Sequence, residues 1–140
     1  MMLHLLRLRD ISGTIPRWLT ISFNRVRISE DATQKLSTLK RRTGLTPNIL
    51  SRIGFCLSLK EPGQPNMKRD SHGQEFNRFV LFGEWDAYYI ALLKMRLIND
   101  RIEYSDNILP ILKEHIERGI VILFNRVRHF RDLSTLGTKS

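Results

Sequence analysis

The sequence predicts a mainly α-helical domain that begins with one short strand and a helix-turn-helix unit and ends with two longer helices. Three observations lead to this fold class. Residues 21–28 alternate between the two faces of a strand, and two helical runs follow, separated by a break at residues 43–48. Beyond residue 84, apolar residues recur at steps of three and four over two further stretches.

The predicted strand is short and needs a partner. One of its faces carries Phe23, Arg25 and Arg27, and the other carries Asn24, Val26 and Ile28. Strands of this length are not stable by themselves, and no obvious hairpin turn follows this one. The same strand of a second chain is therefore one candidate for its partner.

The first predicted helix runs from the N-cap Ser29 to Arg42. The acidic pair after Ser29 favours the positive end of the helix dipole, and three cations in the last turn favour its negative end. Gly44 can adopt the left-handed conformation that stops the helix. The residues that recur at helical spacing and should face the core are Ala32, Leu36 and Leu39.

The second predicted helix begins after Thr46 and runs to Leu59. Thr46 caps it, and Pro47 takes the first helical position, where a missing N–H is tolerated. Because Cys56 lies on the apolar stripe of this helix, we expect a packed, inert thiol rather than a nucleophile. The stripe consists of Ile49, Leu50, Ile53, Cys56 and Leu57.

Two longer helices should follow a loop at residues 60–75, where turn-forming residues lie at both ends. Residues 76–82 suit either a short strand or an extended core segment. The third helix, from about Glu84 to Asp100, should bury Trp85, Tyr88, Tyr89, Leu92, Leu93 and Leu97. The fourth helix should start at Ser105 or Asp106, tolerate Pro110 in its first turn and continue through Gly119. Its core-facing residues are Leu112, Ile116, Ile120, Leu123, Val127 and Phe130.

One short repeat stands out. The pentapeptide Phe-Asn-Arg-Val-Arg occurs at residues 23–27 and again at residues 124–128. The residues around the two copies do not match, and the copies suit different structures. We therefore interpret the repeat as coincidence rather than duplication.

Length and composition indicate a single cytoplasmic domain. The 140 residues suffice for one compact core, which we assign to residues 21–133, between a flexible N-terminal appendage at 1–20 and a flexible tail at 134–140. The single cysteine excludes a disulfide framework and fits a reducing cytoplasm. The apolar opening residues are too few for a signal peptide or a membrane span.

Positive charge is concentrated in the N-terminal half. The chain carries 23 Lys and Arg against 14 Asp and Glu, a net charge of +9. Residues 1–60 hold 11 basic against 3 acidic residues, a difference of +8, whereas residues 61–140 hold 12 against 11, a difference of +1. This one-sided excess beside the strand–helix–helix unit favours a polyanion as partner. The alternative is an ordinary helical hairpin with a solvated basic face.

The strand and the first two helices supply the candidate DNA-binding residues. A two-stranded ribbon can enter the major groove, and the free N–H groups of a helix N-terminus bind phosphate. Arg25 and Arg27 share the outward face of the strand, while cations surround the start of the second helix. The full candidate set is Arg25, Arg27, Lys35, Lys40, Arg41, Arg42, Thr46, Asn48 and Arg52.

No motif indicates an enzyme. The sequence contains no Gly-rich phosphate loop and no Ser, His or Cys in a recognisable nucleophile context. Its four histidines lack metal-ligand spacing, and His115 fits a surface or packed histidine better than a catalytic base. Glu84 and Asp86 complement a helix dipole. We therefore expect no catalytic residues, no metal site and no cofactor.

Two family resemblances build on these residues. Residues 24–59 resemble the ribbon-helix-helix DNA-binding proteins, in which a strand and two helices pair into an intertwined dimer. Six stretches carry a more specific resemblance: residues 27–29, 39–48, 53–59, 75–78, 82–87 and 115–119. In this order they resemble the DndE family, the small component of the bacterial DNA sulfur-modification (phosphorothioation) system. That resemblance covers about residues 24–133.

The DndE resemblance implies a mainly helical protein that assembles as a homotetramer and binds double-stranded DNA with a preference for nicked DNA. It also implies other phosphorothioation-system proteins as partners and no catalytic residues that can be placed in this chain. Two alternatives from other classes stay open. One is a ribbon-helix-helix transcriptional repressor that reads a specific operator through Arg25 and Arg27. The other is an assembly scaffold whose basic face meets an acidic partner protein.

Overall fold

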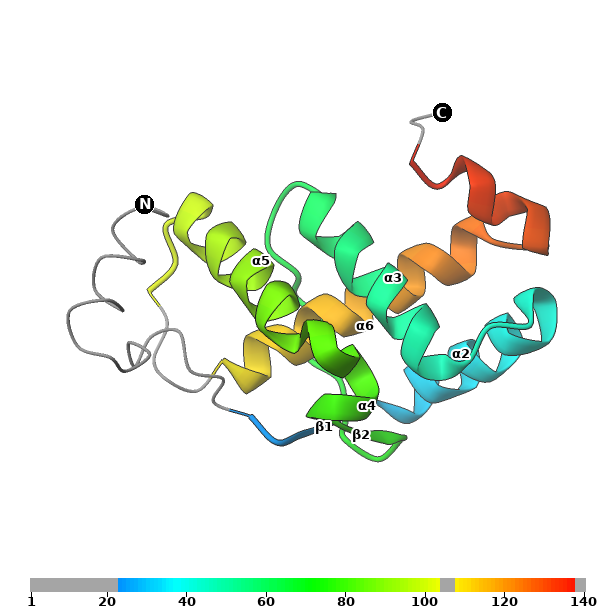
Figure 1. Cartoon of the computed structure of the whole chain (residues 1–140), viewed down its shortest axis with the longest axis horizontal. Coiled ribbons are helices and arrows are strands. Elements are labelled where there is room, and N and C mark those ends of the chain that lie inside the picture. The colour runs from blue at the N-terminus through cyan, green and yellow to red at the C-terminus, as the bar shows by residue number, and fades with distance from the viewer. Residues whose placement is uncertain (1–22, 104–107, 138–140) are drawn as a thin grey trace.

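The computed structural model describes residues 23–103 and 108–137, and within them the chain is mainly helical (Figure 1). Five α-helices and two 3-10 helices accompany one two-stranded sheet in these residues. In chain order the elements are β1 (Arg25–Arg27), α2 (Glu30–Thr43), α3 (Pro47–Lys60), β2 (Glu75–Asn77), α4 (Arg78–Phe82), η2 (Gly83–Trp85), α5 (Asp86–Asn99), α6 (Leu109–Arg126) and η3 (Phe130–Thr135).

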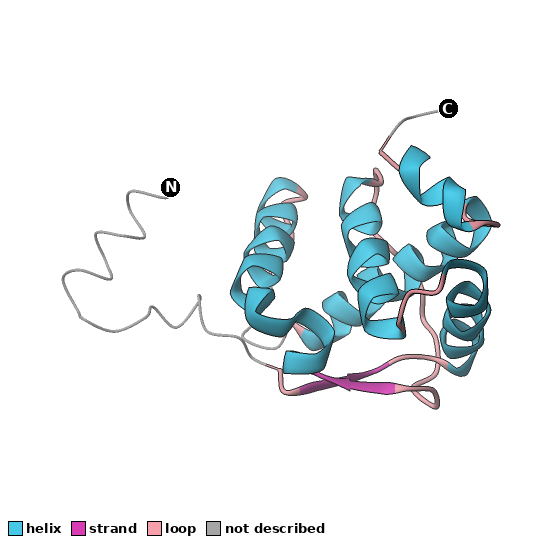
Figure 2. Ribbon diagram, turned by 45° about the vertical axis from the view of Figure 1, so that its right-hand side comes forward, coloured by secondary structure: helices cyan, strands magenta, loops and turns pink. Residues whose placement is uncertain are grey.

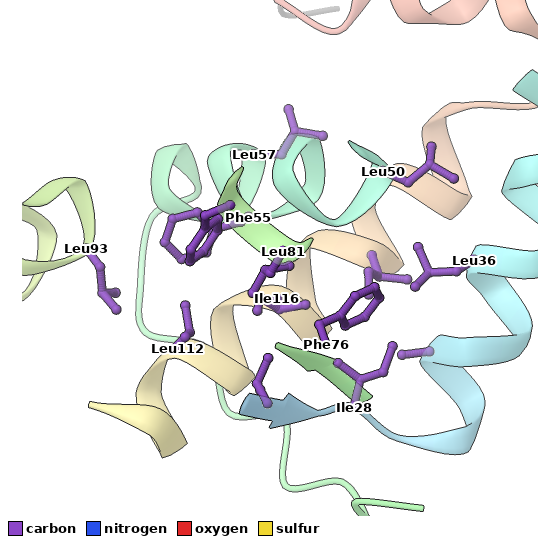
Figure 3. Packing of buried hydrophobic residues seen from close by; sticks show 14 of the residues in the cluster. Ile28, Leu36, Leu50, Phe55, Leu57, Phe76, Leu81, Leu93, Leu112 and Ile116 are labelled. Carbon is purple, nitrogen blue, oxygen red and sulfur yellow. The ribbon is translucent and has the colours of Figure 1, made fainter. Parts of the chain in front are cut away.

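Helix α6 is the central element of the fold. It packs against α3, α2 and β1, and Figure 1 shows it crossing the body of the molecule beside α3. In Figure 3, Phe76 projects from β2 toward this core, on the side where α2 lies. The burial of five residues confirms most of the predicted core face of the last helix: Leu112, Ile116, Ile120, Leu123 and Val127.

Helices α3 and α6 approach each other most closely at two glycines. A Cβ atom built on Gly119 would lie 1.9 Å from the carbonyl oxygen of Gly54, and one built on Gly54 would lie 2.9 Å from the carbonyl carbon of Gly119. Neither position has room for a side chain. The glycine within the predicted long helix, which lowers its helix propensity, is therefore required by this crossing.

The strand partner comes from the same chain. Strand β1 pairs antiparallel with β2, with Val26 opposite Phe76, and the helices lie on one side of the sheet (Figure 2). The ladder continues beyond β1, because the Ile28 N–H donates to the Gln74 carbonyl at 2.9 Å and the Gly73 N–H donates to the Ile28 carbonyl at 2.8 Å. The second chain that we considered as a strand partner is thus not needed for this pairing.

The predicted ends of the first two helices are largely confirmed. The Ser29 hydroxyl accepts the Ala32 N–H at 3.1 Å, and Gly44 stops α2 with φ of 79°. Thr46 is the N-cap residue of α3, and Pro47 takes the first helical position, as expected. The Thr46 side chain, however, makes no capping hydrogen bond to the helix backbone.

The third predicted helix, from about Glu84 to Asp100, is divided into η2 and α5. Residues 76–82, expected to be a short strand or an extended core segment, form the end of β2 and then the helix α4, and η2 follows before α5 begins at Asp86. The buried stripe of α5 contains Ile90 together with Leu93 and Leu97, of which the last two were expected. Trp85 and Tyr88, which we expected to be buried, are 59% and 61% exposed.

Phe130 is a second correction to the predicted core. Helical spacing assigns it to the apolar face of the last helix, but α6 ends at Arg126 and the chain turns into η3. Helical spacing therefore no longer applies between Val127 and Phe130, and the Phe130 side chain is 59% exposed.

Some predictions fall outside the described residues. The N-terminal appendage at 1–20 and the helix start at Ser105 or Asp106 are among them. In the described part of the chain, no helix is long and apolar enough to cross a membrane.

Candidate nucleic-acid interface

The two arginines of β1 are exposed but lie beside a carboxylate. Buried Val26 separates them, so both point to the outer face of the sheet, as predicted. The Glu75 carboxylate on β2 lies 3.4 Å from Arg25 and 3.6 Å from Arg27, and Arg27 also donates to the Gly73 carbonyl at 3.0 Å. Exposed ion pairs of this kind add little stability. Glu75 nevertheless offsets part of the positive charge on this face.

Two candidate cations of α2 pack on one aromatic ring of α6. The Lys35 Nζ lies 5.3 Å from the centre of the Phe124 ring, and the guanidinium carbon of Arg42 lies 4.8 Å from it. Arg42 Nη1 also donates to the carbonyls of Phe124 at 3.5 Å and Val127 at 3.3 Å. Lys35 Nζ lies 2.6 Å from the Asp31 carboxylate. These contacts hold the end of α2 beside the end of α6.

The candidates at the start of α3 are engaged within the protein. Arg52 Nη2 donates to the Val80 carbonyl at 3.3 Å, and Arg52 Nε donates to the Leu81 carbonyl at 2.5 Å, which joins α3 to α4. The Thr46 hydroxyl donates to the Asn48 side-chain oxygen. Arg52 therefore joins two helices of the chain, and the Thr46 hydroxyl is engaged by Asn48.

Lys40 and Arg41 are the candidates with the fewest intramolecular ties. Both are exposed in the last turn of α2, where cations are favoured by the helix dipole. Arg41 Nη2 donates to the Thr38 hydroxyl at 3.2 Å. Among residues 23–103 and 108–137, neither cation has a carboxylate within 4 Å.

Three further arginines, which the sequence reasoning missed, lie on the segment that adjoins the end of α2. Arg126, Arg128 and Arg131 are exposed at the end of α6 and in η3. The hydrogen bonds from Arg42 to the end of α6 bring their segment next to the end of α2 (Figure 1). The Phe-Asn-Arg-Val-Arg repeat in the sequence could have pointed to Arg126 and Arg128. Both copies of the Phe-Asn-Arg-Val-Arg repeat bury their valine and expose both arginines.

The segment that carries Arg128 and Arg131 is held in place by local hydrogen bonds. The Asp132 carboxylate accepts the backbone N–H of Arg128 at 2.8 Å and that of His129 at 3.0 Å. These bonds lower the pKa of Asp132, so the carboxyl group is ionised at neutral pH. The His129 ring in turn accepts the Arg131 N–H at 3.3 Å. The arginines of η3 are thus presented from a defined backbone.

A buried polar network lies away from this surface, where α3 crosses α6. His115 is 1% exposed, and its Nδ1 lies 2.9 Å from the Ser58 hydroxyl, which also accepts Arg118 Nε at 2.8 Å. Burial lowers the pKa of His115 to about 4, and the charges of Arg118 and Arg96 act in the same direction. Neutral His115 is packed in the interior, which confirms the expectation of a surface or packed histidine.

An open groove of about 380 Å³ lies along the outer face of α3 and contains Cys56 and Tyr89. Burial raises the pKa of the Cys56 thiol and that of the Tyr89 hydroxyl. Both groups are therefore protonated at neutral pH, although Cys56 is half-buried at the groove and less packed than we expected. In the described part of the chain, no three His, Cys, Asp or Glu side chains gather to form a metal site.

Comparisons with known proteins agree with this structure. The family model described as "DNA sulphur modification protein DndE" matches residues 25–130. No curated protein sequence matches the chain. The crystal structure of DndE from Escherichia coli B7A, involved in DNA phosphorothioation modification, is 25% identical with a TM-score of 0.61. That alignment covers 72% of this chain and 96% of that chain.

A second similar structure is a glycine-to-lysine mutant of DndE involved in DNA phosphorothioation. It is 24% identical, has a TM-score of 0.58 and covers 74% of this chain and 98% of that chain, which shows a shared fold. The family match covers more than half of the chain and includes every described helix except most of η3. The chain therefore belongs to the DndE family of DNA phosphorothioation proteins.

Proposed function

We propose that this protein is a non-catalytic subunit of a DNA phosphorothioation complex and binds double-stranded DNA, with a preference for nicked DNA, through its basic surface. The observation that carries the proposal is the charge distribution, because a difference of +8 falls within residues 1–60. Several of these cations, including Lys40 and Arg41, are exposed in the structure. Surfaces of this kind bind the phosphate backbone of nucleic acids largely without regard to sequence.

The structural roles of its reactive side chains support a binding function. His115 and Ser58 bond to each other in the interior, and Arg118 covers carbonyl groups at the end of α3. Cys56 and Tyr89 hold their protons at neutral pH. The buried His115–Ser58 pair and the protonated Cys56 thiol thus lack the exposed, activated nucleophile that covalent catalysis uses.

An exposed apolar band supports the proposed homotetramer. Its residues lie on α4, η2 and α5, and exposed apolar residues that gather together mark interaction surfaces. Its members are Phe79, Val80, Trp85, Tyr88, Met95 and Ile98. We propose that copies of the chain associate through this band in the cytoplasm, and that other proteins of the phosphorothioation system bind the assembly.

Gel-shift experiments with nicked, intact and single-stranded DNA test the proposal. Each substrate is tested at two salt concentrations, and two unrelated duplex sequences are compared. We expect the nicked duplex to bind most tightly, both intact duplexes to bind alike, and all binding to weaken as salt rises. Absence of duplex binding, or binding that ignores salt, would contradict the proposal. Strong discrimination between the two duplexes would instead favour a sequence-reading repressor.

A further inference from the structure

We propose that the phosphate backbone of DNA is held at the end of the molecule where α2 and α6 finish, and not along the β1 face. We name this surface the α2–α6 end and define it by Lys40, Arg41, Arg126, Arg128 and Arg131. The inference rests on the proposed DNA-binding function and adds the place of contact. It also joins two segments that are far apart in the sequence into one site.

Arg42 is the residue that assembles the α2–α6 end. Its guanidinium lies over the Phe124 ring and donates to the carbonyls of Phe124 and Val127, so the last turns of both helices meet there. Leu133 of η3 packs against the hydrophobic core, which keeps the following segment close. The exposed cations of the two segments are therefore carried by adjoining parts of one fixed scaffold.

Electrostatics favour phosphate binding at this end. Helix C-termini carry partial negative charge on unpaired carbonyl groups, which would repel phosphate. Here Arg42 covers carbonyls at the end of α6, and the Gly44 N–H donates to the Lys40 carbonyl at 2.8 Å. The exposed cations then dominate the local charge.

Acidic neighbours remove less charge at the α2–α6 end than on the β1 face. Glu61 lies 3.8 Å from Arg126, and Asp132 is engaged by backbone N–H groups. On the β1 face, by contrast, Glu75 lies within 4 Å of both arginines. The α2–α6 end thus carries the larger uncompensated positive charge among the described residues.

Three double variants with the same change in net charge locate the contact. Two remove cations from the α2–α6 end, and the third is a matched control on the β1 face. Binding of a labelled nicked duplex is measured over a series of salt concentrations, and thermal unfolding confirms that each protein is folded. The variants are Lys40→Gln/Arg41→Gln, Arg128→Gln/Arg131→Gln and, as control, Arg25→Gln/Arg27→Gln.

We expect each α2–α6 variant to weaken binding about tenfold or more and to reduce the slope of log affinity against log salt by about 1–2, since each phosphate contact contributes about 0.9. The control should keep the slope of the unchanged protein. Equal losses of affinity in all three variants would overturn this location, because the net positive charge of the protein would then explain the binding. Loss confined to the control would place the contact on β1. Absence of binding by the unchanged protein would overturn the proposed function together with this site.

Discussion

Glu117 is only 1% exposed, and its carboxylate accepts two hydrogen bonds from one residue of another element. The backbone N–H and the hydroxyl of Ser29 each donate to it at 2.7 Å. The same hydroxyl accepts the N–H of Ala32 and so caps α2. Glu117 thereby fastens the start of the basic helix to α6, at a helix N-terminus where negative charge is stabilising.

We predict that Glu117→Gln lowers the free energy of unfolding by about 1–3 kcal/mol. An amide has only one acceptor oxygen, so one of the two Ser29 donors would face an NH₂ group and remain unsatisfied. Urea unfolding measures the effect. Glu114→Gln, on the half-buried neighbouring turn of α6, is the matched control and should change stability by less than about 0.5 kcal/mol. Equal stability of the two variants would show that the Ser29 bonds contribute little.

The buried histidine predicts how stability depends on pH. The pKa of His115 is lowered to about 4 in the folded protein, below its ordinary value of 6.5, so the unfolded chain binds this proton more readily. The contribution of His115 is therefore fully present above pH 6.5 and is lost as pH falls toward 4. The slope approaches about 1.4 kcal/mol per pH unit at most.

Urea unfolding at several pH values between 4 and 6.5 tests this prediction. The unchanged protein should lose stability across this window, and His115→Gln should show a shallower dependence although it is less stable overall. His72→Gln, which changes an exposed histidine, should keep the dependence of the unchanged protein. If the His115→Gln protein kept the original dependence of stability on pH, that dependence would have to come from other titratable groups.

At the scale of the elements, the crossing of α3 and α6 depends on the absence of two side chains. Alanine normally favours a helix over glycine by about 1 kcal/mol. At residue 119, however, the added methyl group would lie 1.9 Å from the carbonyl oxygen of Gly54, so the helices would have to separate. The steric effect is the larger one, because overpacking a core costs about 1–3 kcal/mol even where the structure can adjust.

We therefore predict that Gly119→Ala destabilises the protein by at least about 1 kcal/mol, against its helix propensity. Thermal or urea unfolding measures the change. Gly137→Ala is the control, since a Cβ atom at that position meets no atom within 4 Å. A more stable Gly119→Ala protein would mean that the two helices cross at a larger distance than the structure shows.

The sequence predicted the elements whose signals are local, and it failed where distant segments meet. Ser29, Gly44 and Pro47 mark the ends of α2 and α3 correctly, because caps and stops depend on neighbouring residues. The pairing of β1 with β2 joins residues about fifty positions apart and left no local signal. Helical spacing alone likewise placed Trp85 and Tyr88 in the core, whereas both are exposed in the structure.

In the candidate site, too, local sequence signals gave correct predictions and contacts between distant segments did not. Periodicity and charge identified Lys40 and Arg41 as exposed cations, and the structure agrees. The engagement of Arg42 and Arg52 with backbone carbonyls of α6 and α4 depends on tertiary packing, so composition gave no sign of it. The identical pentapeptides are a strand at residues 23–27 and a helix end at 124–128, which shows that surroundings decide the conformation.

At the scale of the whole molecule, the apolar band on α4, η2 and α5 predicts self-association. Tyr88→Asp and Met95→Asp each place a charge on a side chain that is now exposed, so the folded monomer tolerates the change. We expect light scattering to detect a tetramer for the unchanged protein and smaller species for both variants. The control Ser37→Asp places the same charge on an exposed residue of α2, away from the named band. Tetramers in all variants would place the interface elsewhere.

The basic surface is the property of the whole molecule on which the proposed function depends. The affinity of the unchanged protein for two unrelated duplexes, measured by fluorescence anisotropy over a salt series, tests this claim most directly. We predict that log affinity falls linearly with log salt for both duplexes, with a slope of about −0.9 per phosphate contact and closely similar affinities. Affinity that does not change with salt, or that differs strongly between the two duplexes, would contradict binding through the phosphate backbone.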